Sequence, residues 1–245
     1  MSVLISAKDF GLRFKLSRFK NSRIKDLLVN AVKSSKRVNQ REHFWALRNI
    51  NFDLHRGEVL GVIGSNGSGK STLLRSIGGI YQADEGSIQI TGSVSALLSL
   101  GTGFKDDLSG IENLYLNATV LGFSKQEIDE QLEAIIDFSE LNDFIYEPVK
   151  NYSSGMKARL GFAIAVHLKR DIMLVDEILG VGDFKFRQKS SAKIKELISG
   201  GRTVILVSHS MDSIKNYCTK CLWIDKGVQR AFGEPEEVVE QYLAS

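Results

Sequence analysis

A glycine-rich loop at 64–72, with the sequence Gly-Ser-Asn-Gly-Ser-Gly-Lys-Ser-Thr, constrains the fold more than any other stretch of this chain. An apolar run at 59–63 precedes it and a helix-like segment at 73–77 follows it. A strand, a glycine loop and a helix in this order let backbone N–H groups surround a polyphosphate. The pattern predicts that Lys70 reaches the β- and γ-phosphates and that the Ser71 hydroxyl holds Mg²⁺. The alternative, a glycine turn that binds nothing, does not explain the flanking strand and helix.

The loop by itself indicates a nucleotide and not a particular enzyme, because kinases, GTPases and many ATPases share it. The residues expected to contact the nucleotide here are Ser65, Asn66, Gly67, Ser68, Gly69, Lys70, Ser71 and Thr72.

A second apolar run, at 172–175, ends in the carboxylates of Asp176 and Glu177. Such a run is typical of a parallel strand covered on both faces. Asp176 fits the acid that holds Mg²⁺ in phosphate-loop ATPases. Glu177 points to the other side of the strand, which suits a general base that polarises the water attacking the γ-phosphate. Two solvated acids at a strand end are the alternative, and the accompanying phosphate loop argues against it.

Two further segments carry weaker signals. Ser153, Ser154 and Gly155 precede an apolar stripe at 160–166, so they could form an anion-binding helix start; alone, they would more simply be a helix cap. His209 follows a buried strand pattern and is a candidate γ-phosphate sensor at the edge of the sheet where ligands bind. Alone, it would be a structural histidine.

Taken together, these segments resemble an ABC-type ATPase cassette. The phosphate loop, a signature helix at 152–156, the strand at 171–177 and a switch histidine at His209 come in the order and spacing of that family, and Asp183 falls where the family has its D-loop aspartate. The resemblance implies an α/β fold with a RecA-like core, an antiparallel β subdomain and a helical subdomain that carries the signature. It also implies ATP and Mg²⁺ as cofactors.

Four segments, at 95–104, 108–113, 152–156 and 181–186, resemble more narrowly the ATP-binding subunits that export O-antigen, capsular polysaccharide or teichoic acid. The chain departs from general ABC practice in one respect, since the Q-loop glutamine is absent and the corresponding position lies near Leu100. We expect the Leu-Gly-x-Gly-Phe loop at 100–104 to take over its coupling role.

The resemblance implies the ATP-hydrolysing subunit of an exporter of lipid-linked polysaccharide. Two copies would pair head to tail, so that each ATP lies between the phosphate loop of one chain and Ser153–Gly155 of the other, and closure would bring Glu177 and His209 around the γ-phosphate. A separate transmembrane permease, in two copies, would carry the polymer. The chain would then bind peripherally at the cytoplasmic face of the bacterial inner membrane.

Two alternatives remain open: a soluble ABC ATPase of DNA maintenance, and an ABC exporter of a small lipid or drug. The stretch between Thr72 and Ser153 is too short for a long coiled coil, and the basic excess is confined to one insert instead of lining a groove. Both features speak against nucleic acid as a partner. A polytopic membrane partner in a pull-down would indicate export, whereas retention on duplex DNA would indicate the first alternative.

The composition agrees with a cytosolic chain. Its 245 residues, of which 43% are hydrophobic, fit one α/β domain with a full core. The sequence has neither a run of about 18 apolar residues nor the apolar core of a signal peptide at its start. We interpret Cys218 and Cys221 as reduced structural cysteines, because a zinc site would need two more suitable ligands.

The chain is expected to form a single nucleotide-binding domain over 1–245. We expect edge strands at 1–14 and 44–56, and short strands at 86–100 that join them in the antiparallel subdomain. The helical subdomain would cover 104–165, where Ser109/Glu112 and Ser124/Glu127 match capping boxes. Strands and helices alternate over 166–232, and a last helix at 234–244 leaves no room for an added carbohydrate-binding domain.

A basic insert occupies 13–43, and its stretch 13–41 holds ten Lys or Arg against one acid, Asp26. Its apolar residues fit one face of a helix. The helix could lie near anionic lipid head groups or the phosphate of a lipid-linked substrate, or it could be a solvated cap. Just after the insert, Trp45 is the expected stacking partner of adenine, with Phe44 as the alternative.

Overall fold

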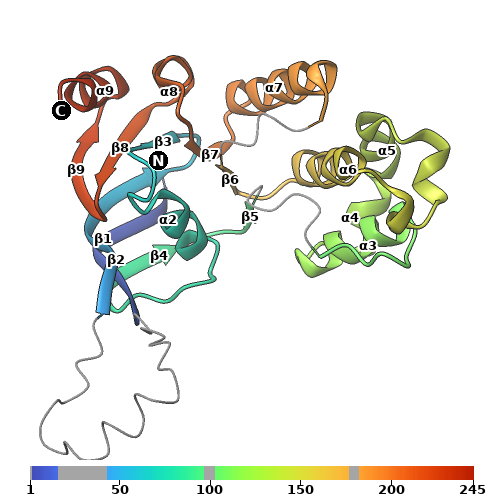
Figure 1. The fold of residues 1–245 in the computed structure, drawn as a ribbon, viewed down its shortest axis with the longest axis horizontal. Coiled ribbons are helices and arrows are strands. Elements are labelled where there is room, and N and C mark those ends of the chain that lie inside the picture. Colours follow the sequence, from blue (N-terminus) through green and yellow to red (C-terminus); the bar gives the residue numbers. More distant parts are fainter. Residues whose placement is uncertain (1, 16–42, 97–102, 177–181) are drawn as a thin grey trace, which may run out of the picture.

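The computed structural model of this chain describes residues 2–15, 43–96, 103–176 and 182–245. Within these ranges the strands form one nine-stranded sheet in the order β4-β1-β2-β9-β8-β3-β7-β6-β5 (Figure 1). The strands are β1 (Val3–Lys15), β2 (His43–His55), β3 (Val59–Ile63), β4 (Glu85–Ile90), β5 (Val94–Ala96), β6 (Ile172–Asp176), β7 (Thr203–Val207), β8 (Lys220–Asp225) and β9 (Val228–Gly233).

The helices are α2 (Lys70–Ile77), α3 (Gly110–Val120), α4 (Lys125–Asp129), α5 (Leu132–Ser139), α6 (Ser154–His167), α7 (Phe184–Ser199), α8 (Met211–Tyr217) and α9 (Pro235–Leu243), with 3₁₀ turns η1 (Asn142–Tyr146) and η2 (Val149–Asn151). Among the described residues, the helices include none long and apolar enough to cross a membrane.

The parallel half of the sheet brings the predicted site residues to one edge. β3 lies between β8 and β7, and β6 lies between β7 and β5, all in parallel register. β3 and β7 are buried along their whole length because helices cover both faces. The phosphate loop follows β3, Asp176 ends β6 and His209 follows β7, so the carboxyl ends of three neighbouring strands meet.

Alternate residues of these strands pack into two different cores. Leu60 and Val62 face the core that contains α2 and the antiparallel strands. Val59 and Ile63 face the other core, which α6, α7, α8 and α9 cover. Because successive side chains of a strand point to opposite faces, and both faces of β3 pack against an apolar core, every residue of the strand has to be apolar.

The antiparallel part differs from the sequence expectation in two respects. β1 pairs with both β2 and β4, so neither β1 nor β2 is an edge strand, and β4 forms that edge. The two strands of the segment 86–100 do not both join the antiparallel part, as the sequence predicted. β4 joins β1, whereas β5 pairs in parallel with β6 at the opposite edge of the sheet. Pairing between distant segments decides both outcomes, and local patterns do not contain it.

A separate helical layer lies beside the sheet (Figure 1). It contains α3 to α6 and has its own apolar core, in which Leu114, Ile135 and Leu160 are completely buried. Both predicted capping boxes are confirmed: the Ser109 and Ser124 hydroxyls accept from the backbone N–H groups of Glu112 and Glu127, whose carboxylates bond back.

Candidate functional site

Backbone geometry forces glycine at two points of the phosphate loop. Gly64 and Gly69 have φ angles of +146° and +109°, in the region that favours glycine. A Cβ on Gly64 would lie 2.0 Å from the carbonyl oxygen of Ile224, and one on Gly69 would lie 2.7 Å from Cδ2 of Leu47. The loop therefore packs closely against β8 and β2, and a side chain at Gly64 or Gly69 would disturb this packing.

Lys70 begins α2, and its side chain is buried among the loop carbonyls. Its Nζ donates to the carbonyl oxygens of Gly64, over 2.7 Å, and Ser65, over 3.0 Å. Because the N-cap Gly69 has no side chain, the first N–H groups of α2 are left for another acceptor. A cation and a helix N-terminus thus converge on one point, which suits a phosphate group.

Ser71 and Asp176 form the candidate Mg²⁺ position. The Ser71 hydroxyl donates to Oδ2 of Asp176 over 3.2 Å. A hydroxyl and a carboxylate are the hard oxygen ligands that Mg²⁺ prefers, with phosphate oxygens and water completing its shell. The donor set therefore fits the ion. The hydroxyl of Ser68 supports a ligand in the loop as well, because it is buried and has no hydrogen-bond partner among the described residues.

These residues line a cavity of about 300 Å³. Its wall consists of Phe14, Phe44, Ala46, the loop from Asn66 to Thr72, Asp176, Val207 and His209. The structure thus brings His209 to the phosphate loop, as predicted. Of the predicted loop contacts, Ser65 lies outside the cavity wall and offers its carbonyl to Lys70.

Trp45, the expected adenine partner, lies outside the wall of this cavity, so its stacking on adenine stays a prediction. Side chains alternate along β2, and Phe44 and Ala46 face the cavity while Trp45 faces the other way. There the indole lies between Arg13 and Arg48, whose guanidinium carbons are 5.6 and 5.0 Å from its ring centre. The alternative, Phe44, does reach the cavity and is 53% exposed.

The predicted signature residues and the D-loop aspartate share a second concave surface. It has a volume of about 650 Å³ and is lined by Ser153, Ser154, Gly155, Met156, Ala158, Arg159, Gly182 and Asp183. Ser153 caps α6 by accepting from the Met156 N–H over 3.2 Å. Asp183 caps α7 by accepting from the Phe186 N–H over 2.9 Å. Sequence reasoning found both turns from their residue types but missed Arg159 between them.

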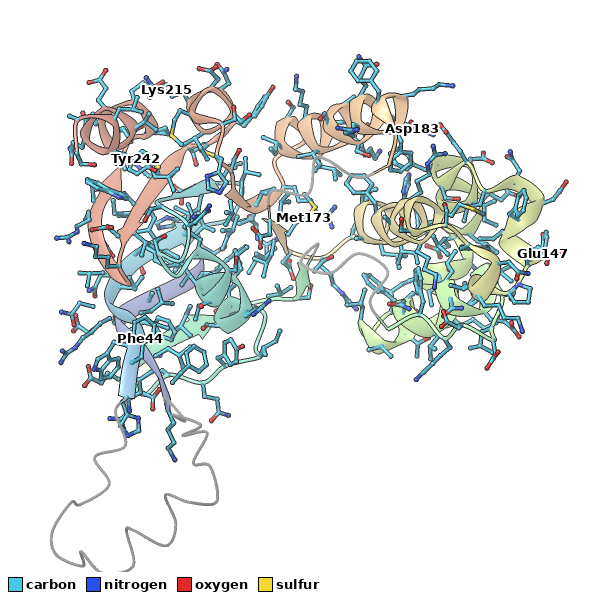
Figure 2. The ribbon with its side chains drawn as sticks, in the orientation of Figure 1. Phe44, Glu147, Met173, Asp183, Lys215 and Tyr242 are labelled. Atoms are coloured by element: carbon cyan, nitrogen blue, oxygen red, sulfur yellow. The ribbon has the colours of Figure 1, made fainter. Side chains whose placement is uncertain are left out.

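The two surfaces have no lining residue in common. Figure 2 places Phe44 and Asp183 in well-separated parts of the molecule, Phe44 on the sheet and Asp183 at the start of α7. One copy of the chain therefore does not bring its own Ser153–Gly155 turn to its own phosphate loop.

Several predicted features lie outside the described residues. They are Glu177, the Leu100 end of the 100–104 loop, and residues 16–42 of the basic insert. Phe14, at the start of that insert, is a cavity residue that sequence reasoning missed. Cys218 and Cys221 are free and buried. Among the described residues, no three His, Cys, Asp or Glu side chains gather, as a zinc site would require.

Comparisons with known proteins agree with this geometry. Residues 47–180 match the ABC transporter family. The chain is 48% identical over 197 residues to the O-antigen export system ATP-binding protein RfbB of Myxococcus xanthus. The matched residues are 80% of this chain and 45% of RfbB. It is 44% identical over 240 residues to the teichoic acids export ATP-binding protein TagH of Lactococcus lactis, covering 98% of this chain and 50% of that protein. The chain thus spans about half the length of these relatives.

A shorter relative matches nearly end to end. TagH of Staphylococcus epidermidis is 40% identical over 244 residues, which is 100% of this chain and 89% of that protein. Among solved structures, a bacterial ABC transporter cassette in dimeric form has a TM-score of 0.72 at 20% identity, covering 95% of this chain and 99% of that one. This structural likeness shows the shared α/β fold. With a family match over more than half of its length and relatives at this level of identity, the chain belongs to the ABC transporter family.

Proposed function

We propose that this chain is the ATP-hydrolysing subunit of an exporter that moves a lipid-linked polysaccharide across the cytoplasmic membrane. The observation that carries the ATPase part is the Ser71–Asp176 pair at 3.2 Å beside the phosphate loop. The pair would supply two Mg²⁺ ligands next to the cation and N–H groups that would hold a triphosphate.

The residues of this chain would divide the work as follows. Ser71 and Asp176 hold Mg²⁺, which when bound neutralises charge on the phosphate oxygens. Lys70 leaves its loop carbonyls to bind the β- and γ-phosphates. Glu177 accepts a proton from the attacking water. His209 contacts the γ-phosphate from the end of β7.

A second copy of the chain would complete each site. Ser153, Ser154 and Gly155 stand at the start of α6, whose first N–H groups are available for an anion, yet they lie apart from the phosphate loop of the same copy. Head-to-tail pairing of two copies would place this turn opposite the partner's γ-phosphate. Hydrolysis would then separate the two copies and drive a transmembrane permease at the cytoplasmic face of the membrane.

The polysaccharide cargo is supported by the relatives, which are named for export of O-antigen and teichoic acids. The test is to delete the gene in its host and to measure surface glycan and intracellular lipid-linked polymer. Deletion should remove surface polymer and accumulate it inside. The wild-type chain should restore export, whereas a matched Lys70→Ala chain should not. Unchanged surface glycan, with a small lipid or drug retained in the cell instead, would contradict the cargo.

A further inference from the structure

Arg159 lies between two carboxylates that belong to different elements. Its side chain rises from α6 and is only 20% exposed. Nη1 donates to Oε2 of Glu140, at the end of α5, over 3.3 Å, and Nη2 donates to Oδ2 of Asp183, before α7. One guanidinium thus joins α6 to the end of α5 and to the start of α7. A guanidinium suits this role because it is planar and carries several N–H donors.

Each carboxylate is also held from its other side. Glu140 has a left-handed backbone, with φ of 57°, which is uncommon for a residue with a side chain. Its Oε1 accepts from Nζ of Lys189 over 2.9 Å, and this bond above all lowers its pKa. Asp183 uses Oδ1 to accept from the Phe186 N–H. Arg159 therefore contacts two anchored acids, and not two mobile surface groups.

The side chain of Arg159 packs against a cluster of aromatic rings. The rings of Phe138, Phe162 and Phe186 lie 5.7 to 6.0 Å apart, between centres. The guanidinium carbon of Arg159 lies 5.1 Å from the Phe186 ring centre, within reach of a cation–π contact. Water is partly excluded from the pair of Arg159 and Glu140, whose side chains are 20% and 30% exposed, whereas the Asp183 carboxylate is 60% exposed. The first bond is therefore stronger than that of an exposed ion pair, and the second depends more on its charge-assisted geometry.

We propose that Arg159 is a positioning residue that fixes Asp183 relative to the Ser153–Gly155 turn. Arg159, Asp183 and the turn line one surface. The guanidinium holds Asp183 and the turn in a fixed relative position, so that they face the second copy as one rigid surface. The inference rests on the proposed function, because that surface acts only where it meets the partner's nucleotide. In this role Arg159 acts through Asp183 and the turn and not by contact with the nucleotide.

This role predicts a specific kinetic signature. ATP binds first to the phosphate loop of one copy, which Arg159 does not contact, so KM for ATP should stay within about twofold. A loosened signature surface should instead lower kcat, by about tenfold to a hundredfold, the size of loss that a small misplacement of catalytic groups produces. Lysine keeps the positive charge but lacks the planar set of N–H donors that lets Arg159 bond to both carboxylates. The kcat of Arg159→Lys should therefore lie between that of the wild type and that of Arg159→Met.

The test compares Arg159→Met with Lys189→Met in the full chain. Lys189 bonds to the same Glu140 and stacks over Phe138, but it does not reach Asp183. The Lys189 variant should lose comparable stability in urea while its kcat stays within about twofold. The proposal is overturned if Arg159→Met keeps kcat within twofold, or loses no more than Lys189→Met.

A second readout separates this proposal from the proposed function. Amide hydrogen exchange of the peptide containing 182–186 should accelerate at least about tenfold in Arg159→Met and much less in Lys189→Met, because the Phe186 N–H loses an anchored acceptor. Unchanged exchange overturns the positioning role, whether or not the chain hydrolyses ATP. A wild-type chain without ATPase activity would instead overturn the proposed function, and the exchange result would still decide on Arg159.

Discussion

The Ser71 hydroxyl and the Asp176 carboxylate are 105 positions apart in the sequence and 3.2 Å apart in the structure. Ser71 stands in the first turn of α2 and Asp176 ends β6, so the pair exists only because β3 and β6 flank β7 in the parallel sheet. The fold therefore brings two hard oxygen atoms together, which is what the proposed Mg²⁺ position requires.

Asp176→Asn should raise the Mg²⁺ concentration needed for half-maximal ATPase activity by at least about tenfold, the usual cost of disturbing a metal site. The amide is isosteric and can still accept from Ser71, so folding should be preserved. Asp107→Asn is the control, because this carboxylate is 94% exposed and lines neither surface. An unchanged Mg²⁺ dependence of Asp176→Asn would refute the metal role.

Lys70→Ala should abolish ATP binding rather than only slow the chemistry, because it removes ground-state contacts to the phosphates. A fluorescent ATP analogue titrated into the purified chain measures this directly. Arg75→Ala, on the same helix but exposed, should bind like the wild type. An undiminished affinity of Lys70→Ala would contradict the assignment.

Phe44→Ala should weaken ATP binding by roughly five- to a hundredfold, the range expected for loss of one base–aromatic stack. Phe44→Tyr should restore most of it. Trp45→Ala tests the opposite face of the same strand and should leave the affinity within about twofold, while it lowers thermal stability through the lost contacts with Arg13 and Arg48. If Trp45→Ala weakened binding more than Phe44→Ala, adenine would lie elsewhere.

Asp171 should contribute to acid sensitivity. It accepts from the backbone N–H and the hydroxyl of Ser93 and pairs with Arg56, each at 2.9 Å. The Ser93 backbone bond is the main cause that lowers its pKa from 3.8 to about 2. A lowered pKa means that the folded state favours the ionised form. The ionised Asp171 therefore contributes its full stabilisation of the folded state above about pH 4, and this contribution is lost as the pH falls through about 2.

The side chain of Asp171 is 31% exposed, so screening by water limits this contribution to about 1 kcal/mol. Urea unfolding of Asp171→Asn at pH 7 and pH 2.5 measures it. The variant should be less stable than the wild type at pH 7, and its deficit should be clearly smaller at pH 2.5, where the stabilisation by the ionised carboxylate is partly lost. An equal deficit at both pH values would show that the ionised form is not favoured.

The contiguous parts of the site could be predicted from the sequence, and the non-local parts could not. The phosphate loop and both capping boxes depend on residues a few positions apart, whose geometry the backbone itself fixes. The sequence could not tell that Phe44 and not Trp45 lines the cavity, because one residue of register decides which face of a strand a side chain occupies. β5 was misplaced because three residues carry too little pattern to identify their partner strand.

Arg159 was missed for a related reason. Its bond to Asp183 depends on how α6 packs against α7, and no local pattern of α6 contains that packing. By contrast, His209 was expected at the ligand-binding edge of the sheet, because ligands bind at the carboxyl ends of parallel strands.

The account's central claim is that each nucleotide lies between the phosphate loop of one copy and the signature turn of another. Asn66→Cys and Ser154→Cys place one exposed thiol on each of these elements. The native thiols of Cys218 and Cys221 interfere little, since burial raises the pKa of both to about 12 and leaves them protonated at neutral pH.

The decisive measurement is the cross-linking of a mixture of these two variants by a short bismaleimide, in a Glu177→Gln background, which is expected to slow hydrolysis. With ATP, the mixture should yield a cross-linked dimer on a denaturing gel, and each variant alone should yield none. Without ATP the dimer should be absent from all three samples. A mixture that binds ATP but does not cross-link, or equal cross-linking of a single variant, would contradict the composite site.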